Sequence, residues 1–97
     1  MKIFEKPFVF DWDKGNIGKN KKHGVGDKEA EEAFFDRKRK IYKDPLHSGK
    51  EERNILIGTT KRNRLLYIVF TMRGKEIRII SARDINQKEV AMYEKKA

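Results

Sequence analysis

The sequence predicts a small α+β domain, in which helices pack on a mainly antiparallel sheet of about four to six strands. From residue 39 onward, apolar runs alternate with short basic or glycine-containing turns, which is typical of a meander of strands. Two segments between residues 11 and 36 show helical starts and helical spacing, and a third helical start follows near residue 86. A chain of 97 residues accommodates one such domain, so residues 1–97 are expected to fold as a single unit.

A short strand and a first helix are expected near the N-terminus. Residues 8–10 are apolar and follow a proline, which is tolerated at the start of a strand. Asp11 or Asp13 is suited to cap a helix that runs to about Lys22, and Gly24 stands where a left-handed residue would end it. One face of this helix would carry Trp12, Asn16, Asn20 and His23, which are spaced by three or four residues.

A second helix is expected over residues 27–36. Ala30, Ala33 and Phe34 have the spacing of a buried helical stripe. Acidic residues gather near the beginning of the segment, where the helix dipole stabilises negative charge. The segment carries a net charge of −4.

Strands are expected over residues 39–43, 54–59, 65–71 and 75–81. Residues 65–71 are apolar on both faces, which predicts a central strand. In the last strand, Ile77 and Ile79 share one face and Arg78 lies on the other. Turn-forming residues separate the strands at 44–49, 61–64 and 73–75.

A final helix is expected close to the C-terminus. Asn86 and Glu89 stand three residues apart, which is the spacing of a capping box. The helix that they open would run to about Lys95 and pack on the sheet.

Positive charge dominates the composition. Lysine and arginine number 24 against 15 acidic residues, and the net charge is +9. Outside residues 27–36 the chain carries +13. The usual partner of such a surface is a polyanion, above all nucleic acid. A basic surface that only solvates the protein is the alternative interpretation.

No sequence feature indicates a cofactor, a metal centre or a membrane segment. The absence of cysteine excludes disulfides and thiolate ligands. His23 and His47 are the two histidines and belong to no acid–histidine cluster, and the glycines are scattered singly rather than gathered in a phosphate loop. The apolar runs are too short to span a membrane and no signal peptide is evident, so a cytoplasmic protein without a cofactor is expected.

Three groups of cationic residues are candidates for contacts with RNA. The end of the first helix carries Lys19, Lys21, Lys22 and His23. Cations there also stabilise the helix dipole, which is the structural interpretation. Arg62 and Arg64 stand in a predicted hairpin turn, where solvated charge is the alternative. Arg39 belongs to the basic run 37–40, which is typical of a solvated sheet edge.

Arg78 and Arg83 form a further candidate site. Arg78 interrupts an apolar strand and must either be paired or face a groove. Arg83 lies between that strand and the last helix, whose N-terminal N–H groups would join it in binding an anion. A salt bridge to Glu89 or to the acidic second helix is the alternative.

Several blocks of sequence follow one another along nearly the whole chain. They are Phe10-Asp11-Trp12-Asp13, Asn20-Lys21-Lys22-His23-Gly24-Val25, Glu52-Arg53 to Ile57-Gly58, Leu66 to Phe70, and Ile77-Arg78-Ile79-Ile80-Ser81-Ala82-Arg83 with Glu89 and Tyr93. In this order and spacing they resemble the BrnT family, the toxins of bacterial type II toxin–antitoxin pairs. Gly26-Asp27-Lys28 and Asp84-Ile85-Asn86 depart from the family's pattern, and neither touches a predicted catalytic position.

The resemblance implies a RelE-like fold and a ribonuclease that cuts RNA without a metal ion and arrests growth. It also implies a cognate BrnA-like antitoxin that carries a ribbon-helix-helix DNA-binding part and forms a heterotetramer with the toxin. Operator DNA would then be contacted only through the antitoxin.

Metal-free RNA cleavage uses the 2′-hydroxyl as nucleophile and requires a base, an acid and cations that stabilise the phosphorane. We expect Arg78 and Arg83 to hold the scissile phosphate, with Arg64 reaching in from the hairpin. Lys22 or His23 would belong to the acid–base pair. This mechanism requires the cations to converge on one phosphate pocket. The residues expected to bind the rest of the RNA are Lys19, Lys21, Arg39 and Arg62.

Two other functions are open on the sequence alone. A non-catalytic nucleic-acid-binding module would use the same basic surface, with an affinity that falls steeply with salt. A protein-interaction module would dock an acidic partner on that surface. Trp12 is expected in the core rather than as a platform on which bases stack.

Overall fold

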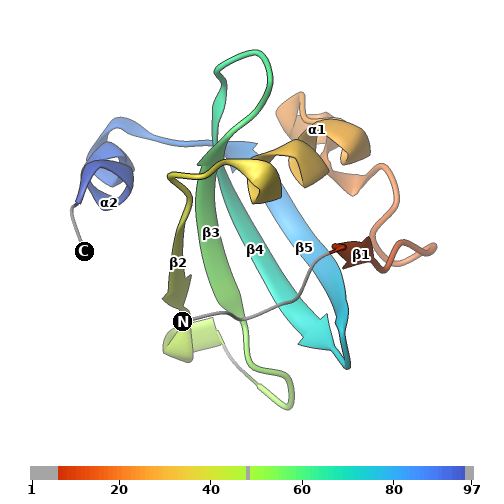
Figure 1. Ribbon diagram of the computed structural model, residues 1–97. Coiled ribbons are helices and arrows are strands. Elements are labelled where there is room, and N and C mark those ends of the chain that lie inside the picture. The colour runs from red at the N-terminus through yellow and green to blue at the C-terminus, as the bar shows by residue number, and fades with distance from the viewer. Residues whose placement is uncertain (1–6, 48, 96–97) are drawn as a thin grey trace.

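A five-stranded sheet forms the centre of the part of the chain that this computed structural model describes, residues 7–47 and 49–95 (Figure 1). Its strands are β1 (Val9–Phe10), β2 (Lys40–Lys43), β3 (Asn54–Thr59), β4 (Leu65–Arg73) and β5 (Glu76–Asp84). Their order is β1-β5-β4-β3-β2, with β1 parallel to β5 and the other neighbours antiparallel. The predicted α+β class is confirmed, and the one short parallel pairing makes the sheet mixed.

The strands predicted in the second half of the chain are all present. β4 is the central strand, as its apolar pattern predicts, and β3 has the predicted bounds. Positive φ angles of 61° at Asn63 and 62° at Gly74 close the hairpins that join β3 to β4 and β4 to β5. The predicted turn over residues 44–49 contains the 3-10 helix η3 (Pro45–His47), and Ser48 lies outside the described residues.

β5 contains a bulge and continues to Asp84, beyond its predicted end at Ser81. Val69 in β4 pairs with Ser81, whereas the next pair of the ladder involves Ile79, so Ile80 has no residue opposite it. An extra residue of this kind shifts the alternation of side chains by one position. Beyond the bulge, Ala82 therefore lies in the core and Ser81 does not.

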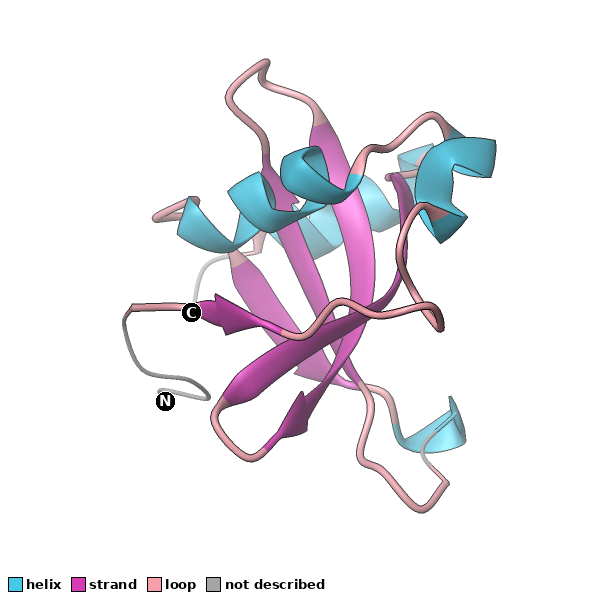
Figure 2. Cartoon of the chain, turned by 90° about the vertical axis from the view of Figure 1, so that its right-hand side faces the viewer, coloured by secondary structure: helices cyan, strands magenta, loops and turns pink. Residues whose placement is uncertain are grey.

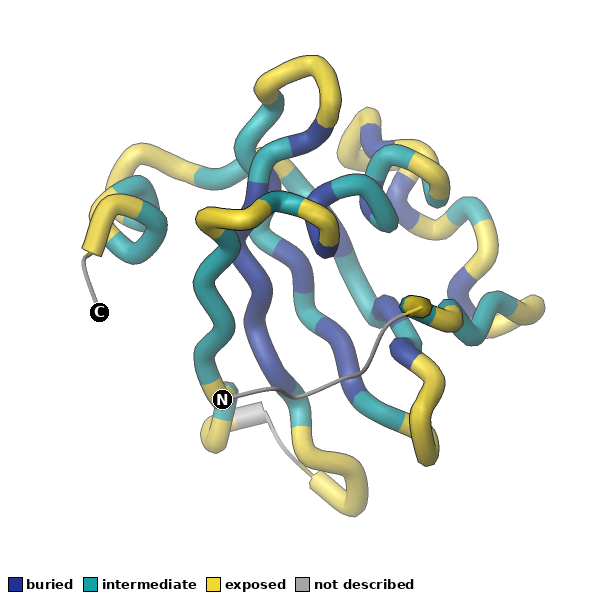
Figure 3. The backbone as a smooth tube through the Cα atoms, in the orientation of Figure 1, coloured by how far each residue is buried: buried dark blue, intermediate teal, exposed yellow. Residues whose placement is uncertain are grey.

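One face of the sheet, here called the inner face, is covered by α1 (Asp27–Glu32) and the 3-10 helix η2 (Ala33–Phe35), as the view from the β1 edge shows (Figure 2). Phe34 is fully buried, and its ring meets those of Phe10 and Phe70 edge-on, with centroids 5.3 and 5.2 Å apart. The buried residues concentrate on β3, β4 and β5 beneath these helices (Figure 3). The predicted second helix is thus present and buries the predicted stripe.

The predicted first helix is wrong in type and extent. Residues 13–18 form turns, and the 3-10 helix η1 (Lys19–His23) follows them. Gly18 has a φ of 70°, which an α-helix does not contain and which interrupts the predicted segment. Gly24, with a φ of 71°, ends η1 as predicted. Among the described residues, α1 is therefore the one α-helix that precedes β2, where two N-terminal helices were expected.

Asn16 and Asn20 bind the edge of β5 that β1 leaves uncovered. Asn16 Nδ2 donates to the carbonyl oxygen of Ile79 at 3.1 Å, and the N–H of Ala82 donates to Asn20 Oδ1 at 2.9 Å. Both side chains are buried. They satisfy backbone groups that a longer β1 would otherwise pair. Trp12, from the same predicted face, packs against the core, as expected.

The last helical segment lies away from α1, toward the opposite face, here called the outer face (Figure 1). The predicted capping box between Asn86 and Glu89 is present and opens the 3-10 helix η4 (Gln87–Glu89), which leads into α2 (Val90–Glu94). Tyr42 in β2 donates to a backbone carbonyl of α2 at 2.6 Å and fastens the helix beside the sheet. None of the helices in the described ranges is long and apolar enough to cross a membrane.

Replacing Gly58 by alanine is expected to destabilise the domain by about 1–3 kcal/mol, the usual cost of overpacking a core. A Cβ atom at Gly58 would lie 2.5 Å from the carbonyl oxygen of Ala33, where η2 crosses β3, and a backbone atom has little freedom to move away. Chemical denaturation measures the change. Gly49→Ala is the matched control, because open space surrounds that position, and equal stability losses in both variants would contradict the prediction.

Candidate active site

The Arg83 cluster consists of Arg83, Tyr67 and Glu89, where β5 meets the last helical segment. The sheet register places Tyr67 opposite Arg83, and Arg83 Cζ lies 4.1 Å from the centroid of the Tyr67 ring. The capping box turns Glu89 back onto the strand, where its two oxygens accept hydrogen bonds from Arg83 Nη1 at 2.8 Å and Nη2 at 2.7 Å. The salt bridge that the sequence left as an alternative is therefore present.

The Arg83 guanidinium is held in place and yet accessible. Its side chain is 37% exposed and that of Glu89 is 16% exposed. The hydrogen bond from Arg83 outweighs burial and lowers the pKa of Glu89, so the carboxylate is ionised at neutral pH. Two parallel N–H···O bonds are the geometry in which a guanidinium binds a carboxylate or a phosphate. The cluster thus combines a fork for an oxyanion, an ionised carboxylate and an aromatic face.

The Arg64 clamp joins the hairpin between β3 and β4 to α1, β5 and the end of η1. Arg64 Nε and Nη2 donate to the Asp84 carboxylate at 2.5 and 2.9 Å, and Nη1 donates to Glu29 at 2.8 Å. Nη1 and Nη2 also donate to the carbonyl oxygens of Gly24 at 2.7 Å and His23 at 3.3 Å. All three guanidinium nitrogens therefore have partners, and the Asp84 hydrogen bond raises the pKa of Arg64.

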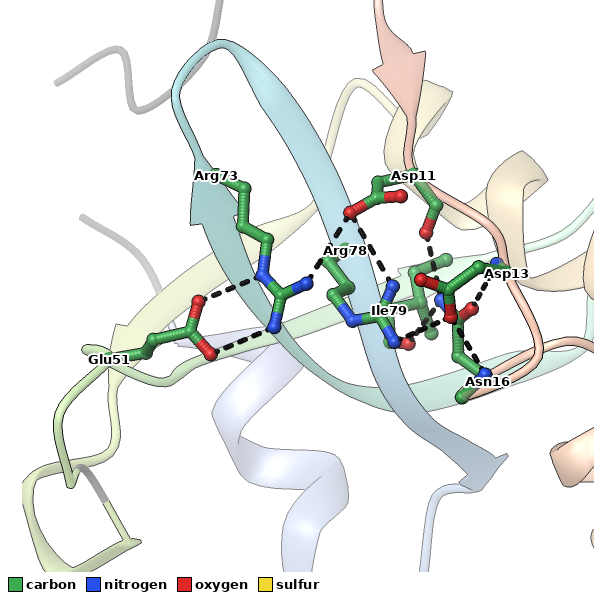
Figure 4. A network of polar contacts seen from close by, with 8 residues as sticks. Asp11, Asp13, Asn16, Glu51, Arg73, Arg78 and Ile79 are labelled. Atoms are coloured by element: carbon green, nitrogen blue, oxygen red, sulfur yellow. Dashed lines mark hydrogen bonds and ion pairs between the residues drawn. The ribbon is translucent and has the colours of Figure 1, made fainter.

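The Arg78 cleft lies at the other end of β5, beside the turn that joins β4 to β5 (Figure 4). Arg78 Nη2 donates to Asp13 at 2.9 Å and Nη1 to Asp11 at 3.4 Å, and its side chain is 12% exposed. Arg73 donates from Nε and Nη2 to the Glu51 carboxylate at 3.0 and 3.3 Å. The cleft has a volume of about 210 Å³, and its lining includes Lys19, Glu51, Arg53, Thr71, Arg73 and Arg78.

The other predicted catalytic and RNA-binding residues lie mostly on the surface. The exposed ones are Lys21, Lys22 and His23 in η1 and Arg62 in the hairpin turn. No hydrogen bond or ion pair of these four side chains occurs in residues 7–47 and 49–95. Arg39 is half-buried, donates to the carbonyl oxygen of Asp36 at 3.2 Å and lies 5.8 Å from the centre of the Phe8 ring.

The predicted convergence of the cations on one phosphate pocket is wrong. Arg78 and Arg83 lie opposite Thr71 and Tyr67, which are four residues apart on β4, so their Cα atoms are separated by about 13 Å at 3.3 Å per residue. Arg64 bonds to Asp84 and to Glu29 in α1. Arg83, the residue before Asp84 on β5, projects from the outer face instead, because successive side chains of a strand alternate. The carbonyl oxygen of His23 accepts a hydrogen bond from Arg64, so the backbone of His23 lies beside Arg64 rather than beside Arg83. The catalytic roles of these residues stay predictions.

Sequence reasoning missed Tyr67 and Arg73 as members of these clusters. The sequence indicates only that Tyr67 belongs to an apolar strand. That Tyr67 lies opposite Arg83 follows from the register between β4 and β5, which the sequence does not reveal. Arg73 had a usable signal, because a hairpin centred on Gly74 places it diagonally across from Arg78. The acidic partners of Arg73 and Arg78 lie in loops that are distant in the sequence and carry no such local signal; they are Asp11, Asp13 and Glu51.

Guanidinium groups supply the positive charge of all three clusters, and the Arg78 cleft also has the ammonium group of Lys19. Within the described ranges, no three histidine, cysteine, aspartate or glutamate side chains are grouped so that they could hold a metal ion. Each cluster sets cations beside carboxylates, which are the groups needed for phosphate binding and for proton transfer.

Comparison with known proteins supports a function in RNA cleavage. Residues 12–89 match the family described as the ribonuclease toxin, BrnT, of type II toxin–antitoxin systems. The match includes the three clusters described above, from Asp13 to Glu89, with Asp11 just outside it. No curated protein matches the chain. Because the match covers most of the 97 residues, the chain belongs to the BrnT family of ribonuclease toxins of type II toxin–antitoxin systems.

Proposed function

We propose that the protein is a metal-independent endoribonuclease whose catalytic centre is the Arg83 cluster. The observation that supports this most directly is the paired hydrogen bonding of the Arg83 guanidinium to Glu89, beside the ring of Tyr67. A phosphodiester presents two non-bridging oxygens that can replace the Glu89 oxygens on the same fork, and the displaced carboxylate is then available as a base. Tyr67 holds the guanidinium flat, so the fork is oriented before the substrate binds.

The proposed reaction is an internal transesterification. The Glu89 carboxylate takes the proton of the 2′-hydroxyl, whose oxygen attacks the adjacent phosphorus atom. The bond between phosphorus and the 5′-oxygen then breaks, which yields a 2′,3′-cyclic phosphate and a 5′-hydroxyl. Arg83 stabilises the charge of the phosphorane. An acid must protonate the leaving 5′-oxygen, and we propose Lys22 or His23 for this role. Both are exposed at the end of η1, and Arg64 links that end to Asp84, the residue that follows Arg83 on β5.

Arg64 enters this proposal as a positioning residue. Its hydrogen bonds to the carbonyl oxygens of His23 and Gly24 fix the end of η1. Its ion pair with Asp84 fixes the residue that follows Arg83 on β5. Arg64 therefore connects the proposed source of the acid to the proposed phosphate site without facing the phosphate itself.

Membership of a type II family implies a protein antitoxin as partner. We propose that this antitoxin is BrnA-like, that it neutralises the ribonuclease and that it forms a heterotetramer with it. Its ribbon-helix-helix part would contact operator DNA, and the toxin would reach DNA only through it. The proposal also includes a RelE-like arrangement of the sheet and a cytoplasmic site of action on cellular RNA.

The experiment that tests this function incubates the purified protein with end-labelled RNA in the presence of a chelator. We expect shortened products that end in a 2′,3′-cyclic phosphate. A gel shift without shortening would instead identify a non-catalytic RNA-binding protein, and cleavage that requires an added divalent ion would refute metal independence. Induction of the gene alone should arrest growth, and co-expression of the antitoxin gene should restore it.

A further inference from the structure

The Arg78 cleft has the composition of an anion site that the proposed reaction does not use. Lys19, Arg53, Arg73 and Arg78 line it, and three acidic residues, Asp11, Asp13 and Glu51, bond to its two central arginines. Glu51 is the acidic residue among those that line the cleft, whereas four of the lining residues are cations. Lys19 is exposed and makes no ion pair in the described part of the chain.

The two arginines at the centre of the cleft are held differently. Arg78 is nearly buried, and Asp13 and Asp11 fix its guanidinium from the side of the N-terminal loop. Arg73 is 48% exposed, and its partner Glu51, which is 47% exposed, stands in the loop before β3. Exposed ion pairs of this kind contribute little to stability, so exchanging Glu51 for another anion costs little. The cleft thus has a fixed donor, Arg78, and an exchangeable one, Arg73.

The bulge at Ile80 places Arg78 and Arg83 on the same face of the sheet. Residues five apart on a regular strand point to opposite faces, because side chains alternate. The extra residue resets this alternation, so that Arg78 lies opposite Thr71 and Arg83 opposite Tyr67, on the face away from α1. Without the bulge, only one of the two arginines would face outward.

We propose that the Arg78 cleft is a second phosphate site, which holds the backbone of single-stranded RNA away from the scissile phosphate at Arg83. This inference rests on the proposed function and extends it along the substrate. The two sites are about 13 Å apart, the length of the four residues of β4 that separate Thr71 from Tyr67. That span corresponds to about four stacked nucleotides at 3.4 Å each, and to fewer in an extended strand. The bulge sets the line that the RNA follows across the outer face.

Two substitutions with opposite expected effects test the cleft. Arg73→Ala removes the exchangeable donor and should weaken binding of a long single strand about tenfold, with a salt dependence whose slope falls by about one. Glu51→Gln removes the competing carboxylate and should tighten binding of the same strand. An ion pair with a purely structural role would not produce opposite changes. Arg37→Ala, at an exposed arginine outside the three clusters, is the matched control and should leave binding unchanged.

The binding probe is an RNA in which every 2′-hydroxyl carries a methyl group, so that binding is measured whether or not the protein cleaves. For cleavable RNA, the ratio of kcat/KM between a long strand and a dinucleotide should fall about tenfold in Arg73→Ala, because a dinucleotide cannot reach both sites. If the protein cleaves RNA and neither variant alters binding of the long strand, the second site is refuted. If binding changes as expected but no RNA is cleaved, the second site stands and the proposed catalysis fails.

Discussion

Replacing Arg83 by alanine is expected to reduce the rate of RNA cleavage at saturating substrate by about 10²–10³-fold, the usual cost of removing one donor that stabilises a transition-state oxyanion. The fork of Arg83 is the only guanidinium in the proposed centre, because those of Arg64 and Arg78 are bound to other carboxylates in other parts of the described structure. Single-turnover cleavage of a labelled RNA measures the effect. The fold should persist, because the Arg83–Glu89 pair is partly exposed.

Variants at the same pair separate catalysis from stability. Arg83→Lys keeps the charge but loses the fork, so it should recover only part of the rate. Glu89→Gln breaks the pair from the other side and also removes the proposed base. Its residual activity should lose the acid limb of the pH profile, which the proposed mechanism assigns to Glu89, because the base must be ionised and its pKa is lowered. Full activity of Arg83→Ala would remove this arginine from the mechanism, and Arg37→Ala controls for the loss of one positive charge.

The elements that the sequence predicts well are those whose local pattern is compatible with one kind of secondary structure only. β3 has the predicted bounds because its apolar run lies between two turns, and the capping box at Asn86 forms because its spacing is specific. The α-helix predicted before Gly24 is a turn followed by a 3-10 helix, because helical spacing alone does not reveal the left-handed conformation of Gly18. Asn16 and Asn20 do share a surface, but it is the edge of β5 rather than a face of an α-helix.

The candidate site could be predicted only as a set of cations. Arg64, Arg78 and Arg83 stand out in the sequence, and each is held in the structure by carboxylates. The sequence indicates Glu89 as a possible partner of Arg83, but it does not reveal the carboxylates that Arg64 and Arg78 bind, since Glu29 and Asp13 are more than thirty residues away from them. The bulge in β5 depends on pairing with β4 and has no local signal. Residue type therefore indicates phosphate chemistry, whereas strand register decides which arginines share the outer face.

Replacing Arg64 by alanine is expected to lower the free energy of unfolding by about 2 kcal/mol, the order expected for the loss of hydrogen bonds between charged partners. The change removes bonds to Asp84, Glu29 and two backbone carbonyls at the end of η1. For a domain of this size, such a loss corresponds to a fall in melting temperature of roughly 10 °C. Thermal unfolding followed by circular dichroism measures it.

Arg62→Ala is the matched control for the Arg64 clamp, because Arg62 stands in the same turn, is exposed and makes no side-chain bond within the described residues. It should unfold at the temperature of the native protein. If Arg64 only positions η1, Arg64→Ala should lose less activity per folded molecule than Arg83→Ala, and Arg64→Lys should regain part of the lost stability. A variant Arg64→Ala that is as stable as the native protein but as inactive as Arg83→Ala would contradict the clamp and return Arg64 to the phosphate site.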